Sequence, residues 1–241
     1  MKLISLNIEG DNHLNDVFTF LQREKPDIVC LQEVFLADFP SFEEKLEMRG
    51  YHLSLMTVLS QNEVRLSQKG EFGIAILSRF PLNNVSIRYY AKYAGELPVY
   101  SGGANVMNRA VLIADVEKDG EFFTIATTHF TWTPNGTVTE LQLDDLDSLR
   151  EILKLIGQFV LCGDFNAPRG KQVFDALAQE YVDNIPSSVT TTMDNKLHRN
   201  HNLDPLVVDG LFTTTNYSAK NTKVVCGVSD HCAIVSEITK Q

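Results

Sequence analysis

Basic residues are scarce in this 241-residue sequence relative to acidic ones. There are 21 Lys and Arg against 31 Asp and Glu, which gives a formal net charge of −10. Proteins that bind long nucleic acids nonspecifically place many Lys and Arg on the phosphates, so this composition argues against that class. It does not exclude a local basic patch, and clustered carboxylates suit a hard divalent cation.

The sequence also lacks features that would divide the chain or anchor it. It contains no Gly/Ser- or Pro-rich linker, no internal repeat and no run long enough to span a membrane. The apolar start is too short for a signal peptide and is followed by Glu9 and Asp11. We therefore expect a single domain over residues 1–241, cytoplasmic, without stable membrane insertion or an obligate protein partner.

Cysteine is rare, with four residues in the whole chain. Cys30 and Cys162 lie within apolar runs, which favours buried free thiols. Cys226 and Cys232 flank a polar turn, and no Cys-x-x-Cys pair indicates a zinc or redox centre. We expect all four to be reduced, as in an intracellular protein.

Short apolar runs rich in Val, Ile and Phe recur along the chain. Their length and composition favour strands over helices. Several are apolar at consecutive positions, as in strands covered on both faces, which indicates stacked layers. The predicted strands are 3–8, 27–34, 72–78, 109–116, 122–130, 159–165, 206–213 and 232–238.

Helical spacing occurs between these runs. Leu14, Val17, Phe18 and Leu21 are spaced for one helical face, and Pro26 lies beyond the predicted end. Three further helices are predicted: one from a capping box at Ser41 and Glu44 to Gly50, one from Thr139 and Gln142 to Gly157, and one around Val173, Phe174 and Leu177.

Two stretches, 89–108 and 186–205, have the composition of long loops. The first carries Tyr93 and Tyr100, whose rings could stack on bases and so bind a nucleic-acid substrate. The second is polar. Long loops in a compact domain are often functional, and a surface insertion is the equally weighted alternative.

Polar residues follow the apolar runs. They are Asn7, Glu33, His129, Asp164 with Asn166, Asp209, and Asp230 with His231. Each has an ordinary structural interpretation alone, as a strand end, a turn or a hydrogen-bonded histidine. However, a carboxylate that emerges from a buried strand is costly unless it is paired or bound to metal. Together the set predicts oxygen ligands for a hard cation and histidines for polarisation and proton transfer.

The ordered segments LNIEG, LQEV, FGIAILSRFPL, TTHFTW, GDFN, VVDGLF and VSDHCAIV resemble the endonuclease/exonuclease/phosphatase superfamily. The resemblance runs from Asn7 to Ile238, and GDFN and SDH are its most specific motifs. It implies an α/β fold, a four-layer sandwich in which two mixed, mainly antiparallel sheets pack face to face with helices on both outer sides. The active site would lie at one end of the sandwich.

The resemblance also implies a metal site for Mg²⁺ or Mn²⁺. Glu33 would be the principal ligand, with Asn7 beside it and Asp230 or Asp164 completing the shell. The all-oxygen set argues against a zinc requirement.

Catalytic roles follow from the same resemblance. Asp164 would orient or deprotonate the attacking water, and Asn166 would hold the scissile phosphate or that water. His231 would hydrogen-bond a phosphate oxygen, and Asp209 would pair with one histidine to fix its tautomer. His129 would assist at the phosphate or the leaving group.

The expected reaction is metal-dependent hydrolysis of a phosphodiester, in DNA or RNA or at a nucleic-acid end. Arg109 would contact a phosphate oxygen, although a structural ion pair is equally plausible. Leu6 stands where many members have Trp, and His129 stands where apurinic-site nucleases carry an Asn-x-Tyr pattern. This disfavours abasic-site cleavage and favours the deoxyribonuclease-like, tyrosyl-DNA phosphodiesterase-like, sphingomyelinase-like and deadenylase-like branches.

Two alternatives stay open. The first is a phosphatase or phospholipase-type hydrolase acting on a small-molecule or lipid phosphoester, such as an inositol phosphate or sphingomyelin, and the acidity of the chain favours it. The second is a binding module that has lost catalysis. The second is the weaker, because Glu33, Asp164, Asn166, Asp209 and His231 are all present.

Overall fold

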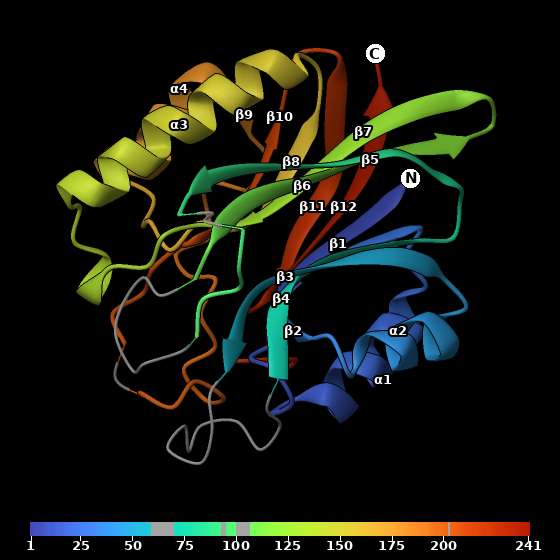
Figure 1. The fold of residues 1–241 in the computed structure, drawn as a ribbon, viewed down its shortest axis with the longest axis horizontal. Coiled ribbons are helices and arrows are strands. Elements are labelled where there is room, and N and C mark those ends of the chain that lie inside the picture. Colours follow the sequence, from blue (N-terminus) through green and yellow to red (C-terminus); the bar gives the residue numbers. More distant parts are fainter. Residues whose placement is uncertain (59–69, 93–94, 100–106, 202) are drawn as a thin grey trace.

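Two six-stranded sheets pack face to face and helices cover their outer faces (Figure 1). The structure, a computed structural model, describes residues 1–58, 70–92, 95–99, 107–201 and 203–241. The first sheet has the strand order β11-β12-β1-β2-β4-β3 and the second has the order β5-β6-β7-β8-β10-β9. The predicted four-layer α/β sandwich is confirmed.

The strands of the first sheet are β1 (Lys2–Asn7), β2 (Ile28–Phe35), β3 (Arg49–Val58), β4 (Gly70–Ser78), β11 (Tyr217–Val225) and β12 (Ala233–Lys240). Those of the second are β5 (Leu82–Ala91), β6 (Arg109–Lys118), β7 (Glu121–His129), β8 (Val160–Asp164), β9 (Val182–Asp183) and β10 (Asp209–Thr213). The helices are α1 (Leu14–Glu24), α2 (Phe39–Leu46), α3 (Glu140–Ile156) and α4 (Gln172–Glu180), with a short 3₁₀ turn at Pro134–Gly136.

Three apolar layers hold the sandwich together. Residues of both sheets, such as Ile76 and Leu112, form the central layer. Helices α1 and α2 pack on the outer face of the first sheet, and α3 and α4 pack on that of the second. The central strands are therefore covered on both faces, which explains their consecutive apolar residues.

Each sheet has one parallel pair of strands at its centre. These pairs are β1 with β2 and β7 with β8, and the other pairings between the twelve described strands are antiparallel. The side chain of Gln32 on β2 donates to the hydroxyl of Thr127 on β7 (3.0 Å), a buried hydrogen bond that joins the two sheets. The carboxyl ends of both parallel pairs therefore lie side by side, and this is where the site forms.

Two details of the predicted elements are wrong. Helix α2 begins at Phe39, so Ser41 lies inside the helix instead of capping it. Pro40 in the first turn explains this, because its fixed φ is suited to a helix start. The helix ends at Leu46 and its C-cap, Glu47, has a left-handed conformation, while Gly50 belongs to β3.

The predicted loop 89–108 begins inside β5, whereas the described part of 186–205 contains no helix or strand. Strands β3, β5 and β11 escaped prediction because each lies at or next to a sheet edge and mixes polar with apolar residues. No helix in the described ranges combines the length and apolarity needed to cross a bilayer.

The expectation that all four cysteines are reduced is wrong. Cys226 and Cys232 form a disulfide, while Cys30 and Cys162 are buried free thiols as expected. Antiparallel pairing of β11 with β12 brings the two cysteines together, since each lies one residue beyond the paired Val225 and Ala233. Disulfides persist mainly in oxidising compartments, so the cysteines no longer support a cytoplasmic location.

Candidate active site

Polar side chains from both sheets meet at the carboxyl ends of the central strands. Asn7 ends β1 and Glu33 lies near the end of β2, while His129 ends β7 and Asp164 ends β8. In the second sheet the strand register places Asp164 opposite His129 on one side and Asp209 on the other. Residues far apart in the chain thus form one row.

Glu33 lies on an irregularity of β2. The register between β2 and β4 shifts from Gln32 to Val34, and Glu33 has a φ of 60°. Such a bulge turns a side chain out of the regular alternation of a strand, and the left-handed conformation is costly for a residue other than glycine. The backbone amide of Gly10 donates to the Glu33 carbonyl (3.0 Å). The bulge leaves the Glu33 side chain 27% exposed at a site whose other carboxylates are buried.

Asn7 joins the two sheets at the site. Its side-chain nitrogen Nδ2 donates to Glu33 Oε1 (3.2 Å) and to Asp164 Oδ2 (3.1 Å). Its oxygen Oδ1 accepts from the backbone amide of Glu9 (3.1 Å). Asn7 therefore holds the two carboxylates close together, and ligation of a metal through its oxygen stays a prediction.

The GDFN segment forms a turn that leaves β8. Asp164 Oδ1 accepts from the backbone amide of Asn166 (2.8 Å), and Asn166 has a φ of 49°. The side chain of Asn166 donates to the carbonyl of Phe130 (3.0 Å). Gly163 lies so close to β7 that an added Cβ would be 2.0 Å from the carbonyl oxygen of Thr128. Gly163 and Asp164 thus end β8, the chain bends after them, and Asp164 lies at the site.

His129 is buried among the carboxylates. Its Nε2 lies 3.5 Å from Asp164 Oδ2 and 3.8 Å from Glu33 Oε1. Burial, together with the positive charge of Arg109, holds the pKa of His129 well below its ordinary value. The ring is neutral, so these contacts are not ion pairs.

Arg109 lies directly behind His129. Its Nη1 donates to the carbonyl of His129 (2.9 Å), and the side chain is almost fully buried. Within the described part of the chain its Nε has no hydrogen-bond partner and the guanidinium forms no ion pair. A buried N–H without a partner is unfavourable, so Arg109 has a donor available for a ligand oxygen.

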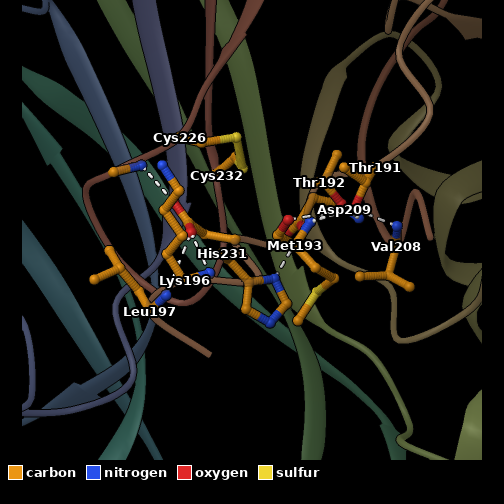
Figure 2. The surroundings of a disulfide bond; sticks show 12 residues. Thr191, Thr192, Met193, Lys196, Leu197, Val208, Asp209, Cys226, His231 and Cys232 are labelled. Carbon is orange, nitrogen blue, oxygen red and sulfur yellow. Dashed lines mark hydrogen bonds and ion pairs between the residues drawn. A yellow bond between two sulfur atoms is a disulfide. The ribbon is translucent and has the colours of Figure 1, made fainter. Parts of the chain in front are cut away.

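His231 and Asp209 form a pair that crosses from one sheet to the other (Figure 2). His231 Nδ1 lies 2.9 Å from Asp209 Oδ2, and Nε2 lies 3.8 Å from Asp164 Oδ2. Burial alone would lower the pKa of His231, but Asp209 and Asp164 outweigh it and hold that pKa well above its ordinary value. These carboxylates therefore favour the imidazolium form of His231, and Asp209 orients the ring.

Asp230 lies beside this pair in the loop before β12 and is buried. Its Oδ1 accepts from the hydroxyl of Ser229 (3.1 Å). Its negative charge contributes to the raised pKa of Glu33, which places the two carboxylates within electrostatic reach of one another.

The family model described as Endonuclease/Exonuclease/phosphatase family matches residues 4–231. The chain belongs to this family. No curated protein sequence matches it significantly. Members of the family hydrolyse phosphoester bonds and depend on divalent metal ions.

Solved structures of the family share the fold at low identity. An endonuclease/exonuclease/phosphatase from Bacteroides vulgatus has a TM-score of 0.75 at 18% identity, covering 100% of this chain and 98% of its own. A mannosyl-6-phosphatase from Bacteroides thetaiotaomicron has a TM-score of 0.70 at 16% identity, covering 99% of each chain. D. rerio TDP2, complexed with single-strand DNA product, has a TM-score of 0.69 at 18% identity, covering 100% of this chain and 99% of its own.

The charges of the site in this family member suit a hard divalent cation. Burial and the charge of Asp230 raise the pKa of Glu33 to about 7, and burial raises the pKa of Asp164 to about 6 despite the opposing charge of His231. Carboxylates that repel one another are stabilised by a cation between them. Glu33 and Asp230, with Asp164 or Asn7, would hold this ion through oxygen.

A second grouping of ligand atoms fits a metal less well. One ligand atom each from Asp164, Asp209 and His231 lies within 4.8 Å of the others. A protonated imidazole repels a cation, and the neighbouring Asp209 and Asp164 favour the protonated form of His231. The Glu33 side of Asp164, which offers oxygen ligands alone, therefore suits a hard cation better.

A cavity of about 220 Å³ opens beside Arg109. Its lining includes Lys92, Arg109 and Asp145, with Met107 and Leu141 as apolar walls. Thr131 donates to the buried carboxylate of Asp145 (2.5 Å). The cavity thus offers both cationic and anionic groups near the site.

Some predicted residues cannot be placed, and others were missed. Tyr93 and Tyr100 lie outside the described residues. Thr192 and Asp194, in the stretch 186–205, were not singled out from the sequence, although both contact the loop that carries His231. Most of their contacts run to backbone atoms, which leave no pattern in a sequence.

Proposed function

We propose that this protein is a Mg²⁺- or Mn²⁺-dependent phosphoesterase in which water attacks the phosphorus of a phosphodiester. One observation carries the proposal. A charged imidazolium, His231, and a cluster of mutually repelling carboxylates, Glu33, Asp164 and Asp230, face the same small region at the sheet ends. The imidazolium would donate a hydrogen bond to a phosphoester oxygen, and the carboxylates would bind the cation.

The metal would be held by Glu33 and Asp230, with Asp164 or Asn7 completing the oxygen set. When bound, a divalent ion neutralises phosphate charge and lowers the pKa of a coordinated water. The protein's own groups supply the remaining functions.

Asp164 is the proposed base. A pKa of about 6 lets this carboxylate accept a proton from water near neutral pH. Asn7 fixes one of its oxygens and the Asn166 amide fixes the other, so its orientation is set before substrate arrives. Asn166 is proposed to hold the phosphate or the water.

His231 is the proposed electrostatic stabiliser. Asp209 occupies its Nδ1, which leaves Nε2–H directed at Asp164 and the region where a phosphate oxygen would lie. A charged donor aimed at developing negative charge lowers the barrier, because that charge grows in the transition state. Neutral His129 and charged Arg109 are proposed to assist at the leaving group and at a phosphate oxygen.

For substrate, we propose a phosphodiester in nucleic acid or at a nucleic-acid end. The DNA complex of the structural relative supports this choice, as do the cations Arg109 and Lys92 at the cavity. A second candidate is a phosphate monoester of a small polar molecule. The confined cavity with Asp145, the net charge of −10 and the mannosyl-6-phosphatase relative favour it.

A substrate panel with Mg²⁺ or Mn²⁺ tests the proposal. It contains single- and double-stranded DNA, RNA, a 5′-tyrosyl oligonucleotide, sphingomyelin, inositol phosphates and hexose phosphates, with Glu33→Gln as the inactive control. We expect turnover of an oligonucleotide phosphodiester that disappears with chelator and in the control. Turnover of hexose phosphate alone would support the second candidate, and full turnover in excess chelator would contradict the proposed chemistry.

A further inference from the structure

The loop that carries Asp230 and His231 is short and connects strands of the first sheet. It runs from Cys226 to Cys232, and the disulfide closes it at its base. Asp209, the partner of His231, begins β10 in the second sheet. The pair therefore depends on something that keeps this loop in place against the other sheet.

Residues 192–194 connect the second sheet to the loop that carries His231. On the second sheet, the hydroxyl of Thr192 accepts from the backbone amides of Val208 (3.0 Å) and Asp209 (3.1 Å). On the loop side, the carbonyl of Thr192 accepts from the amide of Cys232 (2.7 Å). Thr192 is fully buried and contacts both Asp209 and Cys232, the residue that follows His231 (Figure 2).

Asp194 forms hydrogen bonds with the same loop at two points. Its carboxylate Oδ2 accepts from the amide of Gly227 near the loop start (2.6 Å), and its backbone amide donates to the carbonyl of Asp230 near the loop end (2.7 Å). Its other oxygen, Oδ1, accepts from the amides of Lys196 (2.9 Å) and Leu197 (3.3 Å). Asp194 is buried, and both oxygens of its carboxylate accept hydrogen bonds from backbone amides. The proposed chemistry does not use this carboxylate.

We propose that Asp194 is a positioning residue for the Asp209–His231 pair, with Thr192 as its anchor on the second sheet. The inference rests on the proposed function. Asp194 holds the loop in the position where His231 Nδ1 meets Asp209. It touches neither the phosphate nor the reacting water.

The substitution Asp194→Asn keeps the shape and replaces one acceptor with a donor. The amide of Gly227, or the amides of Lys196 and Leu197, would then face an N–H instead of an oxygen. One of the two sets of hydrogen bonds of this side chain is therefore lost. We expect kcat to fall about 10–100-fold, as for groups that orient a catalytic residue, with a much smaller change in KM. Thr192→Val should act in the same direction, while Thr192→Ser, which keeps the hydroxyl, should retain most activity.

Glu43→Gln is the matched control. The Glu43 carboxylate on α2 accepts from the amide of Gly50 (3.0 Å), the same kind of contact on the outer side of the first sheet. This variant should keep wild-type kcat. A fall in kcat equal to that of Asp194→Asn would show that loss of such a contact anywhere is sufficient, and would overturn the proposal.

A double-mutant cycle separates positioning from general destabilisation. In the His231→Ala background, Asp194→Asn should cause no further loss of kcat, because its effect acts through His231. Multiplicative losses would overturn the assignment.

A spectroscopic readout makes the test independent of turnover. The His231 Nδ1–H that donates to Asp209 should give a resolved imidazole proton resonance, absent from His231→Ala. We expect it in wild type and Glu43→Gln, and expect it lost in folded Asp194→Asn. Its persistence unchanged in Asp194→Asn would refute the positioning role. If the resonance is present in wild type and lost in Asp194→Asn but the wild-type protein has no phosphoesterase activity, positioning stands and only the proposed function is removed.

Discussion

Cutting the disulfide should lower stability by an amount that the loop length sets. Cys226 and Cys232 are separated by six positions, so the closed loop holds seven residues. In the chain-entropy description, a cross-link over a loop of this size stabilises the fold by about 2 kcal/mol. For a protein of 241 residues this corresponds to a Tm shift of about 4–8 °C.

The assay is a pair of thermal melts with and without a dithiol reductant. The reductant supplies two electrons and two protons to the disulfide and is itself oxidised to a disulfide. Alkylation followed by mass spectrometry should count two thiols, Cys30 and Cys162, before reduction and four after it. The double variant Cys226→Ser with Cys232→Ser should have a Tm near that of the reduced protein, and the reductant should not change it.

Activity should fall with stability, because the same loop presents Asp230 and His231. The hydrogen bond from the Gly227 amide to Asp194 does not involve the disulfide and should persist after reduction, so kcat should decrease without vanishing. Four thiols in the untreated protein, or an unchanged Tm after verified reduction, would refute the reasoning about this loop.

Three further predictions concern the site. Asp209→Asn should lower kcat about 10–100-fold while Mn²⁺ affinity stays near wild type, because Asp209 orients the histidine without touching substrate. Steady-state kinetics measure kcat and calorimetry measures Mn²⁺ affinity. A wild-type kcat would show that the pairing of Asp209 with His231 has no catalytic importance. The pKa values of Glu33, about 7, and Asp164, about 6, lie above their ordinary values of 4.5 and 3.8. The metal-free protein should therefore lose stability as the pH rises through this range, and Mn²⁺ should raise Tm more at pH 8 than at pH 5. A larger increase in Tm at pH 5 would contradict the assignment. Replacing Tyr93 and Tyr100 with Ala should raise KM for an oligonucleotide and leave a small phosphodiester nearly unaffected, since stacking contributes about 1–3 kcal/mol per base; equal effects on both substrates would indicate a folding role instead.

The sequence was informative where burial acts on whole segments. The central strands β2, β4 and β8 are covered on both faces, so their residues are apolar in succession and could be recognised. Strands β5 and β11, each at a sheet edge, mix polar with apolar residues and left no such signal. Edge strands meet only part of the core, and their composition reflects this.

Site residues were recognisable by type and order, and their geometry was not. Nothing in LQEV reveals that Glu33 takes a positive φ on a bulge, because the bulge arises from pairing with β4. The choice of His231 over His129 as partner of Asp209 depends on how the sheets face one another. The disulfide became visible only when β11 and β12 were paired, and Asp194 acts largely through backbone amides.

The central claim is that Glu33 holds a catalytic cation while His231 acts on the substrate. Calorimetric titration of Mn²⁺ into folded Glu33→Ala and His231→Ala tests it most directly. A hard cation held by few protein oxygens cannot spare a carboxylate, so Glu33→Ala should show no binding at concentrations that saturate wild type. His231→Ala should bind Mn²⁺ with near wild-type affinity, because a charged imidazolium is not a ligand. Loss of binding in His231→Ala as complete as that in Glu33→Ala would make this histidine a ligand and contradict the account.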